Sequence, residues 1–152
     1  MDRIERLEAI EAIRNLKARY FRLIDTRQWG ALAECFASDL RVLTPEGEIY
    51  VEGGPQYAAA LRHSLEHAVS CHQGLTGEIE ILEQTSATGI WAMQDVIEWQ
   101  TAHPRTGWKA ILGRGHYHET YRVEDGAWRI ATLTLTRLRL DITWPEGAER
   151  HD

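Results

Sequence analysis

Three residues carry side chains suited to acid–base chemistry and could meet in one site: Asp25, His72 and Asp95. A neutral imidazole is a good general base near pH 7, because its ordinary pKa is about 6.5. A neighbouring carboxylate orients the ring and stabilises the imidazolium that forms when a proton arrives. Asp25 and Asp95 could each play this part, or both could flank His72, and the sequence leaves the choice open. The plain alternative is that His72 is a surface or capping histidine.

Asp25 lies near the end of a helix predicted over residues 2–26. The prediction rests on apolar residues with helical spacing: Ile4, Leu7, Ile10, Ile13 and Leu16. Tyr20 continues this stripe, so its hydroxyl could donate a proton or hydrogen bond to a substrate oxygen, or be a satisfied core group. Asp25 follows about 140° around the axis, so both can border one cavity only if the helix ends near Asp25. A carboxylate there faces the negative end of the helix dipole and needs a hydrogen-bonding or positive partner.

The opposite face of this helix is expected to be solvated. Its charged residues are Glu5, Glu8, Glu11, Arg14 and Lys17.

Asp95 lies in a predicted strand over residues 87–102. By the two-residue period of a strand, one face carries Trp91, Met93, Asp95, Ile97 and Trp99. A carboxylate buried there without a partner would cost several kcal/mol. We therefore expect a pocket acid that contacts His72, with Trp91 and Met93 as substrate-binding neighbours. The alternative is a face exposed to water.

Two later strands add further candidates, His116 and Arg137. His116 shares a strand face with His118, but Glu119 points to the other face, so no metal site is expected. We expect His116 to line the pocket and polarise a substrate oxygen; it could instead face solvent or a partner subunit. Arg137 has the parity of apolar neighbours, so it could bind a substrate carboxylate or thioester region, pair with Asp95, or lie at a subunit interface.

The composition limits the classes of protein to which this chain can belong. The chain has 152 residues, 43% of them hydrophobic, and a formal net charge of −6. These values predict one globular domain over residues 1–145 and a polar tail over 146–152. Scattered basic residues argue against nucleic acid as a partner, and no apolar run is long enough to span a membrane. Cys35 and Cys71 form no disulfide framework and are expected to be buried, which favours the cytoplasm as the location.

The order of predicted elements indicates an α+β fold. Helices are expected near residues 2–26, 29–36 and 55–67, followed by long strands up to about residue 143. Such strands must curl, so we expect a cone-shaped barrel, cystatin-like, in which a strongly curved antiparallel sheet and three helices enclose a pocket. That pocket is the default ligand site. Apolar residues on the outer sheet face predict a homodimer or homotrimer.

Several motifs resemble the SnoaL-like branch of the nuclear transport factor 2-like superfamily over nearly the whole chain. They are Tyr20-x4-Asp25, Gln28-Trp29-x2-Leu32-x3-Phe36-x2-Asp39, His72, Gly115-His116-Tyr117 before Tyr121, and Asp125-Gly126-Ala127-Trp128-Arg129-Ile130. The spacing of Tyr20, Asp25, His72 and Asp95 is similar to that of the bile acid 7α-dehydratase type. Asp25 with His72 also resembles the pair in scytalone dehydratase and hexachlorocyclohexane dehydrochlorinase, although Tyr20 stands where the dehydrochlorinase has lysine.

The resemblance implies a cofactor-independent lyase or isomerase, of the dehydratase type, for a hydrophobic cyclic or polycyclic small molecule. In that reading His72 removes a proton alpha to an electron-withdrawing group. Two alternatives stay open. One is a non-catalytic small-molecule-binding module of the same fold. The other is an epoxide hydrolase, in which Asp25, Asp95 and an arginine would activate water.

Overall fold

The computed structural model describes residues 1–148; the expected tail over residues 146–152 therefore lies mostly outside the described residues. The helices are α1 (Arg3–Asp25), α2 (Trp29–Ala33) and α3 (Gly54–Leu65). The strands are β1 (Phe36–Leu43), β2 (Ile49–Glu52), β3 (Ala68–Glu83), β4 (Ser86–Trp99), β5 (Ala110–Glu124) and β6 (Ala127–Thr143). The expected order of three helices and long later strands is confirmed.

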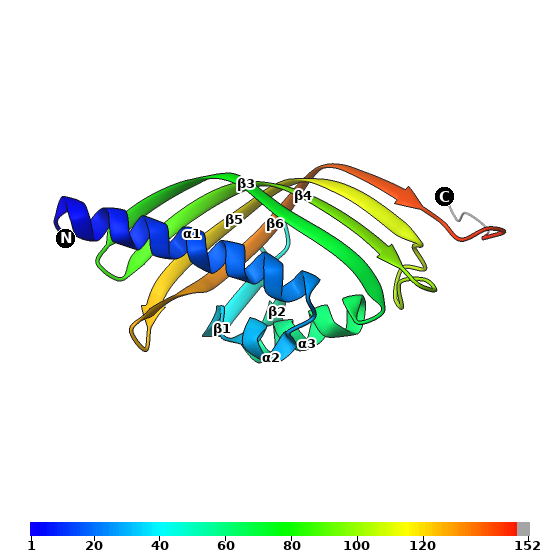
Figure 1. Ribbon diagram of the computed structural model, residues 1–152, viewed down its shortest axis with the longest axis horizontal. Helices are drawn as coiled ribbons and strands as arrows, with labels where there is room; N and C mark the ends of the chain where they lie inside the picture. Colours follow the sequence, from blue (N-terminus) through cyan, green and yellow to red (C-terminus); the bar gives the residue numbers. More distant parts are fainter. Residues whose placement is uncertain (149–152) are drawn as a thin grey trace.

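One curved sheet holds all six strands in the order β2-β1-β6-β5-β4-β3, and its long strands bow over α1 (Figure 1). Neighbouring strands are antiparallel except for β1 and β6, which are parallel. Register shifts interrupt several of the strand pairs, and such bulges bend a sheet and increase its twist. The sheet does not close, so β3 and β2 form its edges. The expected α+β fold with a strongly curved sheet is confirmed.

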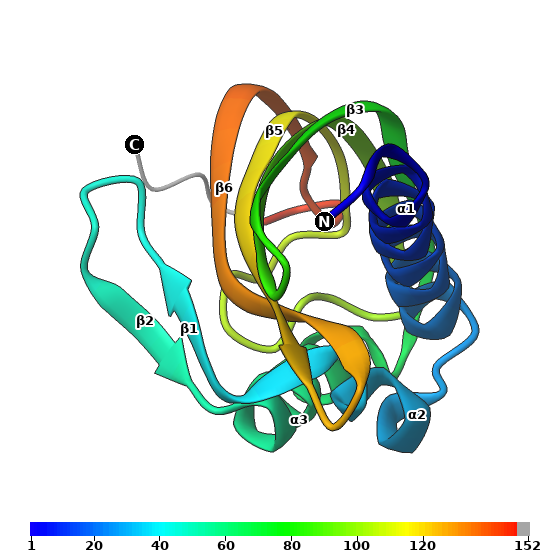
Figure 2. The ribbon, with the colours of Figure 1, turned by 90° about the vertical axis from the view of Figure 1, so that its left-hand side faces the viewer.

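The helices cover the concave face of this sheet (Figure 2). The core between them includes the α1 residues Ile13, Leu16, Tyr20 and Ile24. Close approach of α1 to β3 depends on Gly74, because a Cβ there would lie 2.4 Å from the Phe21 ring. The gap between sheet and helices is thereby set by packing at the middle of β3.

Helix α1 begins with a capping box. Asp2 Oδ1 accepts hydrogen bonds from the backbone N–H groups of Ile4 and Glu5, at 2.7 and 2.9 Å, and the Glu5 side chain accepts one from the Asp2 backbone. The helix ends at Asp25, as the placement of Tyr20 and Asp25 required.

The expected solvent face of α1 is wrong at Lys17, which is only 1% exposed, and the expected apolar stripe is wrong at Ile4 and Leu7. Ile4 and Leu7 are 67% and 59% exposed. The reason is rotation about the axis: Lys17 lies only about 60° from Tyr20, whereas Ile4 and Leu7 lie far from the buried stripe.

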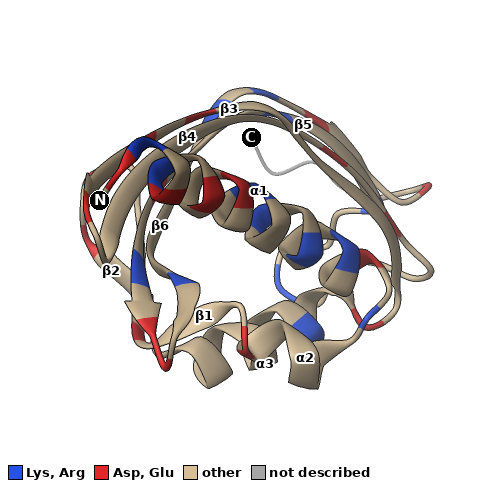
Figure 3. Cartoon of the chain, turned by 60° about the vertical axis from the view of Figure 1, so that its left-hand side comes forward, with Lys and Arg blue, Asp and Glu red and all other residues tan. Residues whose placement is uncertain are grey.

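The convex face of the sheet is more exposed. Cys71 lies there, so its expected burial is wrong, and apolar side chains such as Val96 and Leu138 are exposed. The homodimer or homotrimer stays a prediction. Charges of both signs follow α1: its acidic positions lie mainly in the first half, whereas basic positions occur along its whole length (Figure 3). Within the described part of the chain, no helix combines the length and apolar character needed to cross a membrane.

Candidate active site

A cavity of about 200 Å³ lies between the helices and the concave face of the sheet. Its helical wall consists of Tyr20, Ile24, Tyr57, Leu61, Ser64 and Leu65. Its sheet wall consists of His72, Asp95, Ile97, Trp99, Ile111, Tyr117, Leu135 and Arg137. The loop between β4 and β5 adds His103 and Trp108. The lining is mainly apolar and aromatic with a few polar groups, as in many small-molecule sites.

Asp25 holds the His72 ring on one wall of this cavity. His72 Nδ1 lies 2.7 Å from Asp25 Oδ1, and the ring is 6% exposed. An ionised carboxylate can only accept hydrogen bonds, so the neutral imidazole carries its proton on Nδ1. Nε2 is then the unprotonated nitrogen, and within residues 1–148 it has no hydrogen-bond partner. The arrangement presents a basic nitrogen on a side chain that lines the cavity.

The Asp25 carboxylate also binds the edge of the sheet. Its Oδ2 accepts the backbone N–H of His72 at 2.8 Å, and its Oδ1 accepts the Ser70 hydroxyl at 2.8 Å. The backbone group is free to donate because β3 is an edge strand. Three donors thus offset the unfavourable position of an acid at the helix C-terminus. The same contacts fix where α1 ends relative to His72.

Asp95 has a different partner. It lies directly opposite His72 in the β3–β4 register, but both its oxygens accept hydrogen bonds from Arg137 on β6, at 2.7 and 2.9 Å. This two-point geometry is the strong form of a guanidinium–carboxylate pair. Within residues 1–148, Asp95 therefore makes no hydrogen bond or ion pair with His72, because Arg137 neutralises its carboxylate and takes both oxygens. The alternative pairing of Arg137 with Asp95 is the one present.

The absence of a side chain at Gly113 makes room for this ion pair. Gly113 lies opposite Asp95 in the β4–β5 register, and a Cβ there would lie 2.0 Å from Asp95 Oδ1 and 2.0 Å from Arg137 Nη1. We expect Gly113→Ala to destabilise the protein by about 1–3 kcal/mol, the usual cost of overpacking. Urea unfolding monitored by tryptophan fluorescence measures this change.

Gly30→Ala is the matched control. Gly30 lies in α2 and has no atom within 4 Å of a built Cβ, so alanine should leave stability unchanged or raise it by up to about 1 kcal/mol. Equal unfolding midpoints for Gly113→Ala and the wild type would contradict a tightly packed Asp95–Arg137 pair.

Three tyrosines supply hydroxyl donors to the cavity: Tyr20, Tyr57 and Tyr117. Burial raises the pKa of Tyr20 and of Tyr117 well above the ordinary value for tyrosine. Burial also raises the pKa of Tyr57 to about 12. All three are therefore protonated near neutral pH and can donate a hydrogen bond to an oxygen acceptor.

A buried ion pair lies behind this aromatic wall. Lys17 on α1 pairs with Glu119 on β5, and Tyr121 donates its hydroxyl to the same carboxylate. The Lys17 ammonium lies 3.8 Å from the centroid of the Tyr117 ring and 4.2 Å from that of Tyr20. Burial lowers the pKa of Lys17, and the attraction of Glu119 opposes that shift. The Lys17–Glu119 pair therefore connects α1 to the sheet next to the rings of Tyr20 and Tyr117, which line the cavity.

The structure brings together Tyr20, His72, Asp95 and Arg137 on the cavity wall, with Asp25 behind His72. Two other expected residues belong to the core next to it. Trp91 donates its indole N–H to the Tyr121 hydroxyl at 2.7 Å, and the Met93 sulfur lies 3.8 Å from Arg137 Nη1.

His116 does not line the cavity. It alternates with the inward-facing Tyr117 and lies on the convex face, where its ring is 6.3 Å from that of His118. The expectation that His116 polarises a substrate oxygen in this cavity is corrected accordingly, because its strand parity points it outward.

Four polar lining or supporting residues escaped the sequence reasoning. They are Ser70, Tyr57, His103 and Tyr117. Ser70 could have been found, since it lies two residues before His72 and so shares its strand face. His103 follows β4 in an irregular loop, where no periodicity gives its direction.

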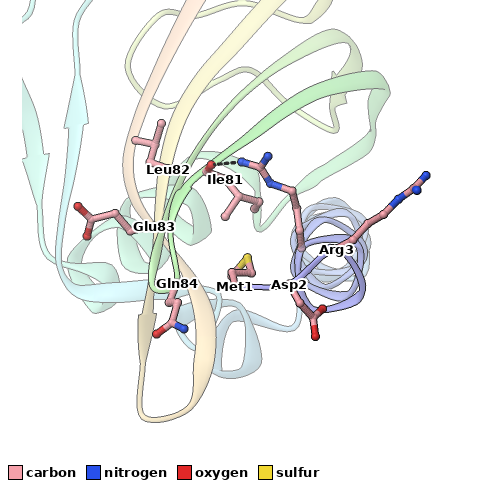
Figure 4. Close-up of a pocket in the computed structure, with 8 residues that line it drawn as sticks. Met1, Asp2, Arg3, Ile81, Leu82, Glu83 and Gln84 are labelled. Carbon is pink, nitrogen blue, oxygen red and sulfur yellow. Dashed lines mark hydrogen bonds between the residues drawn. The ribbon is translucent and has the colours of Figure 1, made fainter.

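A larger hollow of about 540 Å³ lies elsewhere, between the start of α1 and the turn after β3 (Figure 4). Arg6 donates to the Ile81 carbonyl there at 2.6 Å. Exposed side chains such as Met1 and Leu82 line it, and none of the expected catalytic residues does. The smaller cavity at His72 is therefore the candidate active site. In the described ranges, no group of three His, Cys, Asp or Glu side chains converges as a metal site.

Known proteins resemble the chain over nearly its full length. The β subunit of the methanesulfonate monooxygenase hydroxylase of Methylosulfonomonas methylovora is 26% identical, over 95% of this chain and 91% of that protein. The solved structure of a type 2 hexachlorocyclohexane dehydrochlorinase (LinA) superposes with a TM-score of 0.78 at 19% identity, covering 97% of this chain and all of the other. A protein provisionally named a scytalone dehydratase, from Novosphingobium aromaticivorans, gives a TM-score of 0.77 at 19% identity, covering 96% and 98%.

At these identities the structural likeness concerns the fold. The family assignment rests on the sequence itself, since the model of the SnoaL-like domain family matches residues 5–134, which include Tyr20, Asp25, His72 and Asp95. The chain belongs to the SnoaL-like domain family.

Proposed function

We propose that this protein is a cofactor-independent lyase or isomerase in which His72 removes a proton from a carbon atom of a hydrophobic cyclic substrate. The observation that carries the proposal is the 2.7 Å contact between His72 Nδ1 and Asp25 Oδ1. It assigns the proton to Nδ1 and leaves the lone pair of Nε2 for the substrate. As Nε2 takes up a proton, the adjacent carboxylate stabilises the imidazolium.

Other polar groups of the cavity suit the charge that forms on the substrate. Removal of a proton alpha to a carbonyl places negative charge on the carbonyl oxygen, and fixed donors stabilise that charge. Arg137 lines the cavity and is 29% exposed, and its Nε atom makes no hydrogen bond to the described residues. Protonated Tyr20 is hydrogen-bonded to the Tyr57 hydroxyl, and the two together form a second donor group suited to a carbonyl or to a leaving hydroxyl. Elimination follows if a leaving group is lost, and isomerisation if the carbon is reprotonated.

The relatives support this class of reaction without specifying it. Two of the similar folds carry the names of a dehydrochlorinase and a dehydratase. The similar hydroxylase β subunit shows that a related sequence also occurs in a protein named as a subunit of a larger enzyme. The epoxide hydrolase alternative, in which these acids would activate water, has less support. Each oxygen of Asp25 and of Asp95 already accepts a hydrogen bond from another group of the protein.

Hydrogen exchange at carbon tests the proposal before the natural substrate is known. A panel of bicyclic ketones, including 1-tetralone, is incubated with the protein in D₂O near pD 7.5. We expect deuterium to enter the position alpha to the carbonyl faster than in protein-free buffer, as followed by ¹H NMR. Such exchange needs only a base, a positioned carbon acid and stabilisation of the oxyanion.

The result separates an enzyme from a binding module. Ligands that bind with exchange no faster than in buffer would contradict proton abstraction and favour a non-catalytic module of the same fold. Titration by intrinsic tryptophan fluorescence establishes binding independently, since Trp99 and Trp108 line the cavity.

A further inference from the structure

A second histidine, His103, lines the same cavity from the loop between β4 and β5. Its Nδ1 accepts the backbone N–H groups of Arg105 and Thr106, at 3.2 and 3.0 Å. A nitrogen that accepts hydrogen bonds carries no proton, so the neutral His103 ring has its proton on Nε2. His72 has the reverse arrangement, because its Nδ1 faces a carboxylate. One cavity therefore contains two imidazoles of opposite tautomer.

The loop holds the His103 ring in place. The His103 backbone N–H donates to the Trp108 carbonyl at 2.8 Å, and the Gly107 N–H donates to the His103 carbonyl at 2.9 Å. Arg105 ties the loop to β2 through the Tyr50 hydroxyl at 2.7 Å. The ring also packs edge-on against Trp99, with centroids 5.0 Å apart. A donor fixed in this way loses little conformational freedom when a ligand binds.

The surroundings keep this ring neutral. Burial is the main cause that lowers the pKa of His103, and electrostatic effects of the neighbouring Arg105 and His63 act in the same direction. A neutral N–H donor suits an uncharged oxygen acceptor, whereas a carboxylate ligand would favour the protonated ring.

We propose that the Nε2–H group of His103 binds an uncharged oxygen of the ligand and so determines which substrates the cavity accepts. The Nε2 edge of the ring points away from the turn that occupies Nδ1, and no described residue is hydrogen-bonded to it. The ligand class is then a mainly apolar ring system, small enough for about 200 Å³, with a ketone, ether or hydroxyl oxygen near Trp99 and Trp108. The proposal rests on the proposed function only in taking this cavity as the substrate site. A carbonyl oxygen has two lone pairs, so it can accept a hydrogen bond from His103 Nε2–H in addition to one from a donor such as Arg137.

The test compares two probes with the same bicyclic frame, 1-tetralone with a carbonyl oxygen and tetralin without one. In ¹⁵N-labelled protein, long-range ¹H–¹⁵N spectra should show His103 protonated at Nε2 and His72 at Nδ1. We expect 1-tetralone to shift the His103 Nε2 resonance and tetralin to leave it in place. The wild type should bind 1-tetralone more tightly than tetralin.

His103→Asn and His103→Gln separate the donor from the loop. Asparagine can place an amide oxygen near the position of Nδ1 and keep the loop contacts, but it lacks a donor near Nε2. We expect it to weaken 1-tetralone binding about tenfold, as loss of one hydrogen bond implies, with tetralin binding unchanged. Glutamine keeps a donor near Nε2 and should retain most of the preference.

His103 protonated at Nδ1, or an unchanged preference for 1-tetralone in His103→Asn, would overturn the proposal. Failure of the proposed function looks different: deuterium exchange would be absent while the His103 tautomer and the preference for 1-tetralone persist. His72→Ala should likewise keep this binding preference, because it leaves the His103 loop untouched.

Discussion

Replacing His72 with alanine is expected to lower the rate of deuterium incorporation into 1-tetralone by about 10² to 10⁴-fold, the usual contribution of a general base. The reason is loss of the Nε2 lone pair, while the cavity and its oxygen-directed donors remain. Asp25 keeps two partners in this variant, the Ser70 hydroxyl and a backbone N–H, so the end of α1 should stay in place. The exchange rate by ¹H NMR and the unfolding midpoint in urea are measured together.

Two further variants sharpen this result. Cys71→Ala is the matched control, because Cys71 immediately precedes His72 on the same strand and is exposed to solvent. It should exchange at the wild-type rate. Asp25→Asn should lower exchange by a smaller factor than His72→Ala, since the imidazole remains but its proton uptake loses the support of a negative charge. An exchange rate in folded His72→Ala equal to that of Cys71→Ala would remove His72 from the mechanism.

Replacing Lys17 with methionine is expected to cost about 3–5 kcal/mol of stability, the range found when one partner of a buried ion pair is removed. Glu119 would remain 3% exposed without its cation, supported only by neutral hydrogen-bond partners such as Tyr121. The double variant Lys17→Met/Glu119→Gln should recover much of the loss, since no charge is then left buried alone. Urea unfolding of the wild type, both single variants and the double variant gives the coupling free energy.

A surface pair provides the comparison. Arg62 and Glu66 form an ion pair within and just after α3, with side chains 58% and 42% exposed. Arg62→Met should therefore cost less than about 1 kcal/mol. A loss in Lys17→Met no larger than that in Arg62→Met would contradict a structural role for the buried pair.

Strand direction was the most predictable part of the site. Alternation along β4 correctly placed Asp95 on the inner face with Met93 and Ile97, and alternation along β6 placed Arg137 there too. This prediction succeeds because successive side chains of a strand point to opposite faces, a local property of the backbone. The same alternation, followed one residue at a time along β5, places His116 outside and Tyr117 inside.

Residue type misled the prediction on α1. Lysine suggests solvent, yet Lys17 falls within the buried stripe by its angle, and it is tolerated there because Glu119 meets it from 102 residues away. No local sequence pattern predicts a partner so far away along the chain. His103 was missed for a different reason: it lies in an irregular loop after β4, where no periodicity gives the direction of its side chain.

By itself, the sequence determined the order of helices and strands, which residues of a long strand share a face, and the end of α1 near Asp25, because these depend on periodicity and on neighbours in the chain. Only the tertiary structure decided that His72 pairs with Asp25 and that Asp95 pairs with Arg137. Asp95 is the nearer candidate by strand register, but a guanidinium from β6 satisfies both its oxygens. Each acid takes the partner that best compensates its buried charge, and that competition exists only once α1, β3, β4 and β6 have come together.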